Sequence, residues 1–275
     1  MKANISLLYD EDCPLCRWYT AKFVQYHFLA PQGRVSYTKH IQDFQGVIDP
    51  DLAQTKIACF NHDTKEVTYG VDSLLVILSQ RCKLIGTIGK FRPINYLLQL
   101  LYLLVSYNRK IVAPGPKQKV DCACEPSRSV FWRFTFIALI SWFTYLIVHW
   151  YFNNFLTPFL IENPVNDFVL LTLQLLFQTS FFLLFRQKNL YDYVGHLAFT
   201  SFLGALVLLG FGLVIQILGF IGIDTPFFAV ICFGITICFL FFEHKRRIQL
   251  KDWDYKLSLT WIVFRILIYP LVFHI

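Results

Sequence analysis

The chain of 275 residues lacks the motifs by which several large enzyme classes are recognised. It contains no Walker loop, no Rossmann glycine pattern, no His-Glu-x-x-His motif and no haem-attachment sequence. Its N-terminal half also lacks a cluster of basic residues interleaved with aromatic residues, so nucleic acid is not expected as a partner. No cofactor and no bound metal are therefore predicted from these motifs.

Charged residues are scarce in the C-terminal half. Residues 1–130 carry 16 Lys+Arg and 11 Asp+Glu, whereas residues 131–275 carry 9 and 7 and are dominated by Phe, Leu, Ile and Val. A soluble core of that size would not need so much apolar surface, so a soluble domain followed by a membrane domain is predicted. No cleavable signal peptide is expected, because the first apolar run, Ile5 to Tyr9, is short and is followed by acidic residues.

Five stretches of the second half are apolar enough to cross a bilayer, which takes about 20 residues. We expect spans near 132–152, 167–185, 196–221, 226–242 and 257–275. The fourth is the shortest and is open to being partly re-entrant. Arg265 interrupts the last span, and because a charge inside the membrane is costly, we expect it to have a helix-packing or functional role.

Basic residues are absent from two of the expected loops, 153–166 and 222–225. They are present before the first span and after the second and fourth, at Lys117, Lys119, Arg128, Arg133, Arg186, Lys188, Lys245, Arg246, Arg247, Lys251 and Lys256. The positive-inside rule then predicts an integral protein of the cell (inner) membrane. Its N-terminal domain is predicted to be cytoplasmic and its C-terminus to lie outside.

Two thiols lie three positions apart where a predicted strand, Ile5–Tyr9, gives way to a predicted helix, Pro14 to about Leu29. A helix start presents unpaired N–H groups and the positive end of the macrodipole, so a cysteine there should hold its proton weakly. We expect Cys13 to be exposed and to attack, and Cys16, further in, to resolve the mixed disulfide. Pro14 suits the first helical position. In the reducing cytoplasm the pair should rest as a dithiol.

The rest of the soluble half alternates strands and helices. Residues 34–38 alternate as a strand, and residues 56–60 and 65–69 form a predicted hairpin. An apolar helix follows over about 74–78. The order β-α-β-(α)-β-β-α is that of a compact thioredoxin-like fold.

The predicted fold class is therefore an α/β thioredoxin-like domain followed by an all-α transmembrane helical domain. The expected boundaries are 1–112 for the first domain, 113–130 for a linker with a Cys-x-Cys sequence, and 131–275 for the membrane domain.

Three segments resemble the DCC family of predicted thiol-disulfide oxidoreductases, which is named for Asp-Cys-Cys. They are Leu8–Cys16, Tyr69–Ser73, and Tyr102 with Asn108 and Arg109. The resemblance covers roughly residues 5–112 and implies a thioredoxin-like domain. It implies a site made of catalytic Asp12, Cys13 and Cys16, with Tyr9, Asp10, Pro14, Tyr102, Asn108 and Arg109 in support.

The chain departs from the family and fold patterns at two places. Glu11 stands where glycine is common, which affects the approach to Cys13. Thioredoxin places a cis-proline before its third strand, but the corresponding position here falls near Gln54-Thr55, and the nearest proline is Pro50. How a substrate backbone would be held is thus left open.

Several alternatives compete for the same residues. Cys13 and Cys16 are either a redox pair, two inert buried thiols, or half of a Cys₄ zinc site completed by Cys122 and Cys124. The latter two are alternatively a second dithiol that relays electrons from the tail before the first span. Asp12 is either a helix N-cap or a general base for Cys16.

The position of Arg109 is also open. It follows an apolar run, 96–105, that is too short to span and is expected to form a buried or interfacial helix. The guanidinium either faces solvent or lipid headgroups, or lies near the dithiol and stabilises a thiolate.

Two functions remain open from the sequence. The first is a membrane-anchored thiol-disulfide oxidoreductase acting on protein thiols and disulfides, whose membrane half anchors it in the lipid bilayer or transfers electrons to a membrane partner. The second is a membrane protein whose thioredoxin-like domain is a non-catalytic metal-binding or regulatory module.

Overall fold

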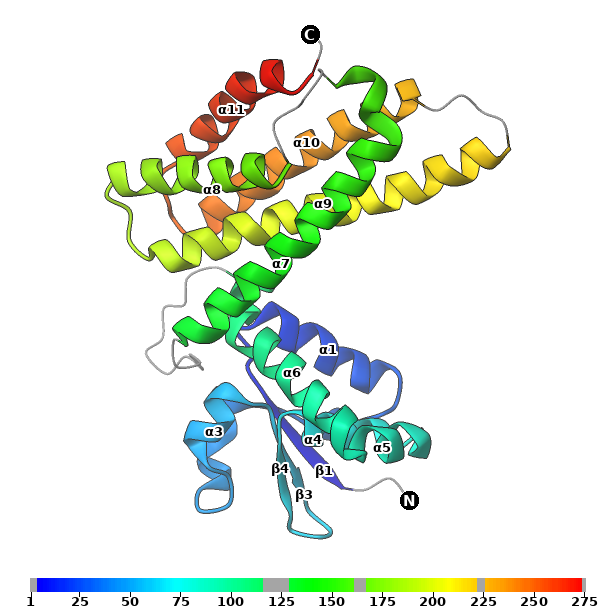
Figure 1. Ribbon diagram of the computed structural model, residues 1–275. Coiled ribbons are helices and arrows are strands. Elements are labelled where there is room, and N and C mark those ends of the chain that lie inside the picture. Colours follow the sequence, from blue (N-terminus) through cyan, green and yellow to red (C-terminus); the bar gives the residue numbers. More distant parts are fainter. Residues whose placement is uncertain (1–3, 116–128, 161–166, 222–225, 274–275) are drawn as a thin grey trace. The chain divides into compact units, whose positions relative to one another are not determined.

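The computed structural model describes residues 4–115, 129–160, 167–221 and 226–273 (Figure 1). The chain divides into two compact units, Met1–Arg133 and Phe134–Ile275. Each unit is considered separately below.

The first unit contains a mixed four-stranded sheet with helices around it. Its elements are β1 (Ile5–Tyr9), α1 (Pro14–Gln25), β2 (Arg34–Ser36), α2 (Tyr37–His40), α3 (Pro50–Thr55), β3 (Ala58–Asn61), β4 (Val67–Tyr69), α4 (Val71–Ser79), α5 (Lys83–Lys90) and α6 (Arg92–Val112). The strand order is β2-β1-β3-β4. The β1–β2 pair is parallel, and the β1–β3 and β3–β4 pairs are antiparallel.

Alternation along the strands assigns side chains to two cores, one on each face of the sheet. On one face Leu7 and Cys59 pack with residues of α1, α4 and α6. On the other face Leu8 and Phe60 pack with residues of α2 and α3. Because strand side chains alternate between faces, the apolar run of β1 is explained by a sheet that is covered on both sides.

The expected strands and the hairpin are present, but the strand expected over 34–38 ends at Ser36, where α2 begins, and the first helix is shorter than predicted. It ends at Gln25 rather than near Leu29. His27 adopts a left-handed backbone conformation with φ of 58°, which a continuing α-helix does not accommodate. The chain then turns back so that β2 can pair with β1.

The second unit consists of helices, and four helices are long and apolar enough to cross a membrane. They are α7 (Val130–Tyr151, continuing irregularly to Phe159), α8 (Asp167–Leu184), α9 (Leu190–Phe220) and α10 (Pro226–Leu250). The length and composition of these helices suggest an integral membrane protein. Close packing of α9 on α10 needs Gly204, because a Cβ there would lie 2.5 Å from Leu240 Cδ2.

The fourth helix is longer than its charge-free stretch. It was expected to end near residue 242 but runs on to Leu250. Glu243 pairs with Arg246 and Arg247 at 2.7 Å, one helical turn away, so these charges stabilise the last turns of the helix. Arg247 is also buried against His196 of α9, at 2.9 Å between Nη1 and Nδ1.

The expected fifth span, 257–275, does not form a helix of spanning length. It forms α11 (Lys256–Ile268), which is followed by a 3₁₀ turn, Tyr269–Leu271, that contains Pro270. Thirteen helical residues cover about 20 Å, less than the ~30 Å hydrocarbon core. The segment ends beside the residues that follow α7, because Phe273 forms a β-bridge with Leu160.

Candidate functional site

Both cysteines of the Cys-x-x-Cys pair lie at the start of α1. Cys13 is the N-cap residue, Pro14 occupies the first helical position, and Cys16 lies within the first turn. Both are free thiols. The expectation that Cys13 is exposed is wrong, because only 4% of Cys13 and 6% of Cys16 is accessible.

A segment distant in sequence lies beside the loop that carries Cys13. The end of α6 leads into Gly115, and a Cβ on Gly115 would lie 3.4 Å from the Asp12 carbonyl and from Pro14 Cγ. The chain after α6 therefore lies against the loop that carries Cys13, a contact between distant segments that local sequence does not reveal.

The two thiols differ in acidity. The pKa of Cys13 is lowered, chiefly because the neighbouring Cys16 thiol can donate to its sulfur; the backbone N–H of Cys16 and the charge of Arg109 act in the same direction against burial. The pKa of Cys16 is raised by the same coupling to Cys13 and by burial. The first sulfur is thus the one prepared to ionise, as a nucleophile must be.

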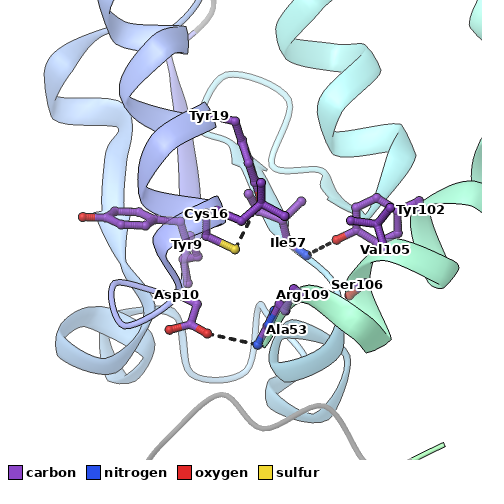
Figure 2. A pocket seen from close by; sticks show the side chains of 12 residues that line it. Tyr9, Asp10, Cys16, Tyr19, Ala53, Ile57, Tyr102, Val105, Ser106 and Arg109 are labelled. Atoms are coloured by element: carbon purple, nitrogen blue, oxygen red, sulfur yellow. Dashed lines mark hydrogen bonds and ion pairs between the residues drawn. The ribbon is translucent and has the colours of Figure 1, made fainter. Parts of the chain in front are cut away.

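A pocket of about 480 Å³, partly open to solvent, adjoins the dithiol. Figure 2 shows the side chains that surround it. The lining residues come from β1, α1, α3, α6 and the loop before β3, and include Tyr9, Asp10, Cys16, Tyr19, Tyr102, Ser106 and Arg109. Cys16 is the member of the dithiol that lines this pocket.

A buried ion pair forms one side of the pocket. Asp10 Oδ2 lies 3.0 Å from Arg109 Nη2, and both side chains are less than a tenth exposed (Figure 2). Asp10 also fixes the loop, because its Oδ1 accepts a hydrogen bond from the Asp12 backbone N–H at 3.0 Å. Burial raises the pKa of Asp10, and the positive charge of Arg109 opposes that shift.

One face of α6 holds the segment before β3. Tyr102 Oη accepts from the Ile57 N–H at 2.9 Å, and Ser106 Oγ donates to the Thr55 carbonyl. Arg109 donates to the Gln54 carbonyl at 3.4 Å. The spacing 102, 106, 109 places the three side chains on one helical stripe. This segment includes the position at which thioredoxin has its cis-proline and this sequence has none. Here side chains of α6 hold the backbone of the segment.

The structure brings together most of the site residues expected from the sequence, but not all of them. Asp12 is exposed, and the N-cap position belongs to Cys13, so the interpretation of Asp12 as the N-cap is wrong. Asn108 is buried elsewhere, with its amide donating to the carbonyls of Leu104 and Trp132. Arg109 lines the same pocket as Cys16, in agreement with the interpretation that places its guanidinium near the dithiol.

Two residues of the site were not predicted. Tyr19 donates to Cys16 Sγ at 3.7 Å, and Ser106 lines the same pocket. Tyr19 lies three residues after Cys16, a spacing that places both on one helical face, so this contact had a sequence signal. Ser106 had none, because its role depends on how α6 docks on the segment before β3.

The remaining cysteine hypotheses concern Cys122 and Cys124, which lie outside the described residues. Within the described ranges no group of three or more His, Cys, Asp or Glu side chains is placed to hold a metal ion. The second dithiol and the Cys₄ site therefore remain expectations from the sequence.

Comparison of the chain with family models, with curated proteins and with solved structures found no match.

Proposed function

We propose that this protein is a membrane-anchored thiol-disulfide oxidoreductase of the DCC type, with a thioredoxin-like N-terminal domain. One observation carries the proposal: two free thiols begin α1, and the second lines a pocket that also contains the Asp10–Arg109 ion pair. A positive charge that lowers the pKa of a thiol, as Arg109 does for Cys13, is typical of the surroundings of reactive cysteines.

The topology supports the fold part of this proposal. A parallel β-α-β unit, an antiparallel hairpin and a following helix give the strand order β2-β1-β3-β4. The dithiol begins the helix of the β-α-β unit, at the carboxyl end of β1, as expected for a thioredoxin-like protein.

In the proposed reaction the Cys13 thiolate attacks one sulfur of a substrate disulfide. A bond forms between Cys13 and that sulfur, and the other substrate sulfur leaves as a thiolate that takes up a proton. The Cys16 thiolate then attacks Cys13 Sγ, closes the Cys13–Cys16 disulfide and releases the second substrate thiol. The substrate gains two electrons and two protons, and the protein loses them; the reverse sequence oxidises a dithiol.

Cys16 must lose its proton in the second step, although its pKa is raised. Asp10 is a better acceptor for it than Asp12, the residue expected from the sequence. Asp10 lines the same pocket as Cys16 and has a raised pKa, whereas Asp12 is exposed. A base with a raised pKa takes up a proton more readily near neutral pH.

The membrane unit is proposed to anchor this domain on the cytoplasmic side. The helix ends that carry Arg186, Lys188, Lys245, Arg246 and Arg247 then share that side with it. In the cytoplasm the site would rest reduced and act on protein disulfides, or pass electrons to a membrane partner.

Trapping tests the proposal. In Cys16→Ser the attacking thiol remains without its resolver, so mixed disulfides with partner proteins should accumulate on Cys13 and disappear with reductant. Cys13→Ser should trap none. Cys82→Ser, a partly exposed cysteine away from the pocket, is the matched control and should behave as wild type. The absence of trapped species from Cys16→Ser would overturn the proposal.

The burial of both sulfurs favours a second candidate, a non-catalytic metal-binding or regulatory module. Elemental analysis of the reduced full chain separates the two. About one zinc per chain, lost only when Cys13 and Cys122 are both replaced, would support the second candidate against the first.

A further inference from the structure

A second pocket lies inside the helical unit and has no part in the proposed redox function. It lies between α7, α8, α9, α10 and α11, and its volume of about 750 Å³ includes space that is open to the surface. Its wall is mostly apolar, with Leu170, Leu208, Phe233, Leu240, Phe264 and Ile268 among the lining side chains. A mostly apolar lining with a few polar groups suits a hydrophobic ligand that carries a polar group.

Among the described residues, the same wall carries a cation, Arg265, that has no carboxylate within ion-pair distance. Arg265 Nη2 donates to Gln174 Oε1 at 2.7 Å, and its guanidinium lies over the rings of Trp261 and Tyr269, at 4.8 and 5.9 Å. Within the described ranges no carboxylate lies within ion-pair distance of Arg265. Arg265 is the tenth residue of α11, so about 14 Å of helix separates it from Lys256.

Two buried donors at this point of the wall have no hydrogen-bond partner among the described residues. Gln174 is 4% exposed, and its Nε2 has no hydrogen-bond partner in the described part of the chain. Arg265 Nε is in the same condition. Buried donors without partners are costly, so a pocket lined by two of them is suited to a ligand that supplies acceptors.

The other charged group of the wall is already engaged. Asp167 pairs with His149 at 3.0 Å. It precedes Gln174 on α8 by two helical turns, about 10 Å, so an acceptor at Gln174 and Arg265 need not approach it.

We infer that this pocket binds an anionic amphiphile, with an acyl chain along the apolar wall and a carboxylate or phosphate oxygen at Arg265 and Gln174. Charge selects the occupant: a guanidinium in an apolar site favours an anionic oxygen over a neutral one. A fatty acid and an anionic phospholipid share this chemistry.

Binding of radiolabelled palmitate to the purified full chain in a neutral detergent tests the inference. We expect saturable binding of about one palmitate per chain, displaced by unlabelled palmitate or by phosphatidylglycerol but not by methyl palmitate. The stronger of the first two competitors identifies the source of the anion. No saturable binding, or equal competition by methyl palmitate or by a neutral quinone, would overturn the inference.

Variants locate the site. Arg265→Gln should weaken palmitate binding at least about tenfold, the loss expected for one charge-assisted hydrogen bond, and Arg265→Lys should lose less. Arg246→Gln, a half-exposed arginine paired with Glu243 away from this pocket, is the matched control. If Arg265→Gln does not fold, Leu171→Trp, which fills the pocket from its wall without changing charge, should abolish binding. Unchanged binding in a folded Arg265→Gln or Leu171→Trp protein would also overturn the inference.

Discussion

Asp10, at the end of β1, forms a buried ion pair with Arg109, on the last turns of α6. The contact fastens the loop before the dithiol to a helix that is distant in sequence. It also places one negative and one positive charge beside two thiols of unequal acidity. The same pair thus contributes to the packing of the first unit and to the electrostatics of the proposed site.

Replacement of Arg109 should show how far the stability of the first unit depends on this ion pair. In Arg109→Leu the Asp10 carboxylate keeps its burial but loses its cation, which we expect to destabilise the first unit by about 3–5 kcal/mol. The measurement is thermal unfolding of the full chain in detergent at pH 7.5. Arg92→Leu, at an exposed position of the same helix, is the control. Equal melting temperatures for the two variants would contradict the prediction.

The same variant should respond to pH in a defined direction. Because burial raises the pKa of Asp10, the folded state holds this proton more tightly than the unfolded state, and the group lowers stability as pH rises above about 4. Loss of Arg109 raises that pKa further. The deficit of Arg109→Leu relative to wild type should therefore be smaller at pH 4.5 than at pH 7.5, and a deficit independent of pH would argue against a charged Asp10.

Alkylation kinetics should report the coupling of the two thiols. Cys13 should react with iodoacetamide with an apparent pKa below the value of about 8.5 for a free cysteine. In Cys16→Ala the main cause of that lowering is removed, so the midpoint should move to higher pH. Mass spectrometry of the labelled peptides measures both. Cys59, whose pKa burial raises to about 11, serves as an internal slow standard. An unchanged midpoint would mean that Cys16 does not activate Cys13.

The hydroxyl group of Tyr102 should contribute more to folding stability than that of an exposed tyrosine on the same helix. Tyr102→Phe leaves the buried Ile57 N–H without its acceptor, which costs about 1–3 kcal/mol. Tyr96→Phe, which is largely exposed, should be neutral. The readout is again the melting temperature of the full chain, and a neutral Tyr102→Phe would show that this hydrogen bond is replaced by water.

The elements that local pattern determines could be predicted from the sequence. The apolar run of β1, the proline after Cys13 and the charge-free stretches predicted the strand, the start of α1 and four helices that are long and apolar enough to cross a membrane. The residues at which helices end were harder to predict. The end of α1 depends on the backbone of His27, and the extension of α10 depends on charges that pair within the helix.

The site was predicted only in part, because its contacts join distant segments. The two cysteines could be identified from their spacing, and Arg109 and Tyr102 only from a resemblance. Asp10 was given a supporting role, while Asp12 was preferred as the base. The structure reverses their environments, since Asp10 is buried with Arg109 and Asp12 is exposed. Burial of a carboxylate depends on the docking of α6, which no local pattern reports.

Membrane topology provides the last prediction. Reporters inserted at residue 188 and at residue 252 should behave as cytoplasmic, and one at residue 160 as external, because basic residues flank only the first two positions. The C-terminus is the sharpest case, since α11 is too short to span as a helix. The bridge between Phe273 and Leu160 places the end of the chain beside the 160 position, so a C-terminal reporter should match the one at 160. A cytoplasmic signal from the C-terminus together with an external signal from residue 160 would contradict this pairing.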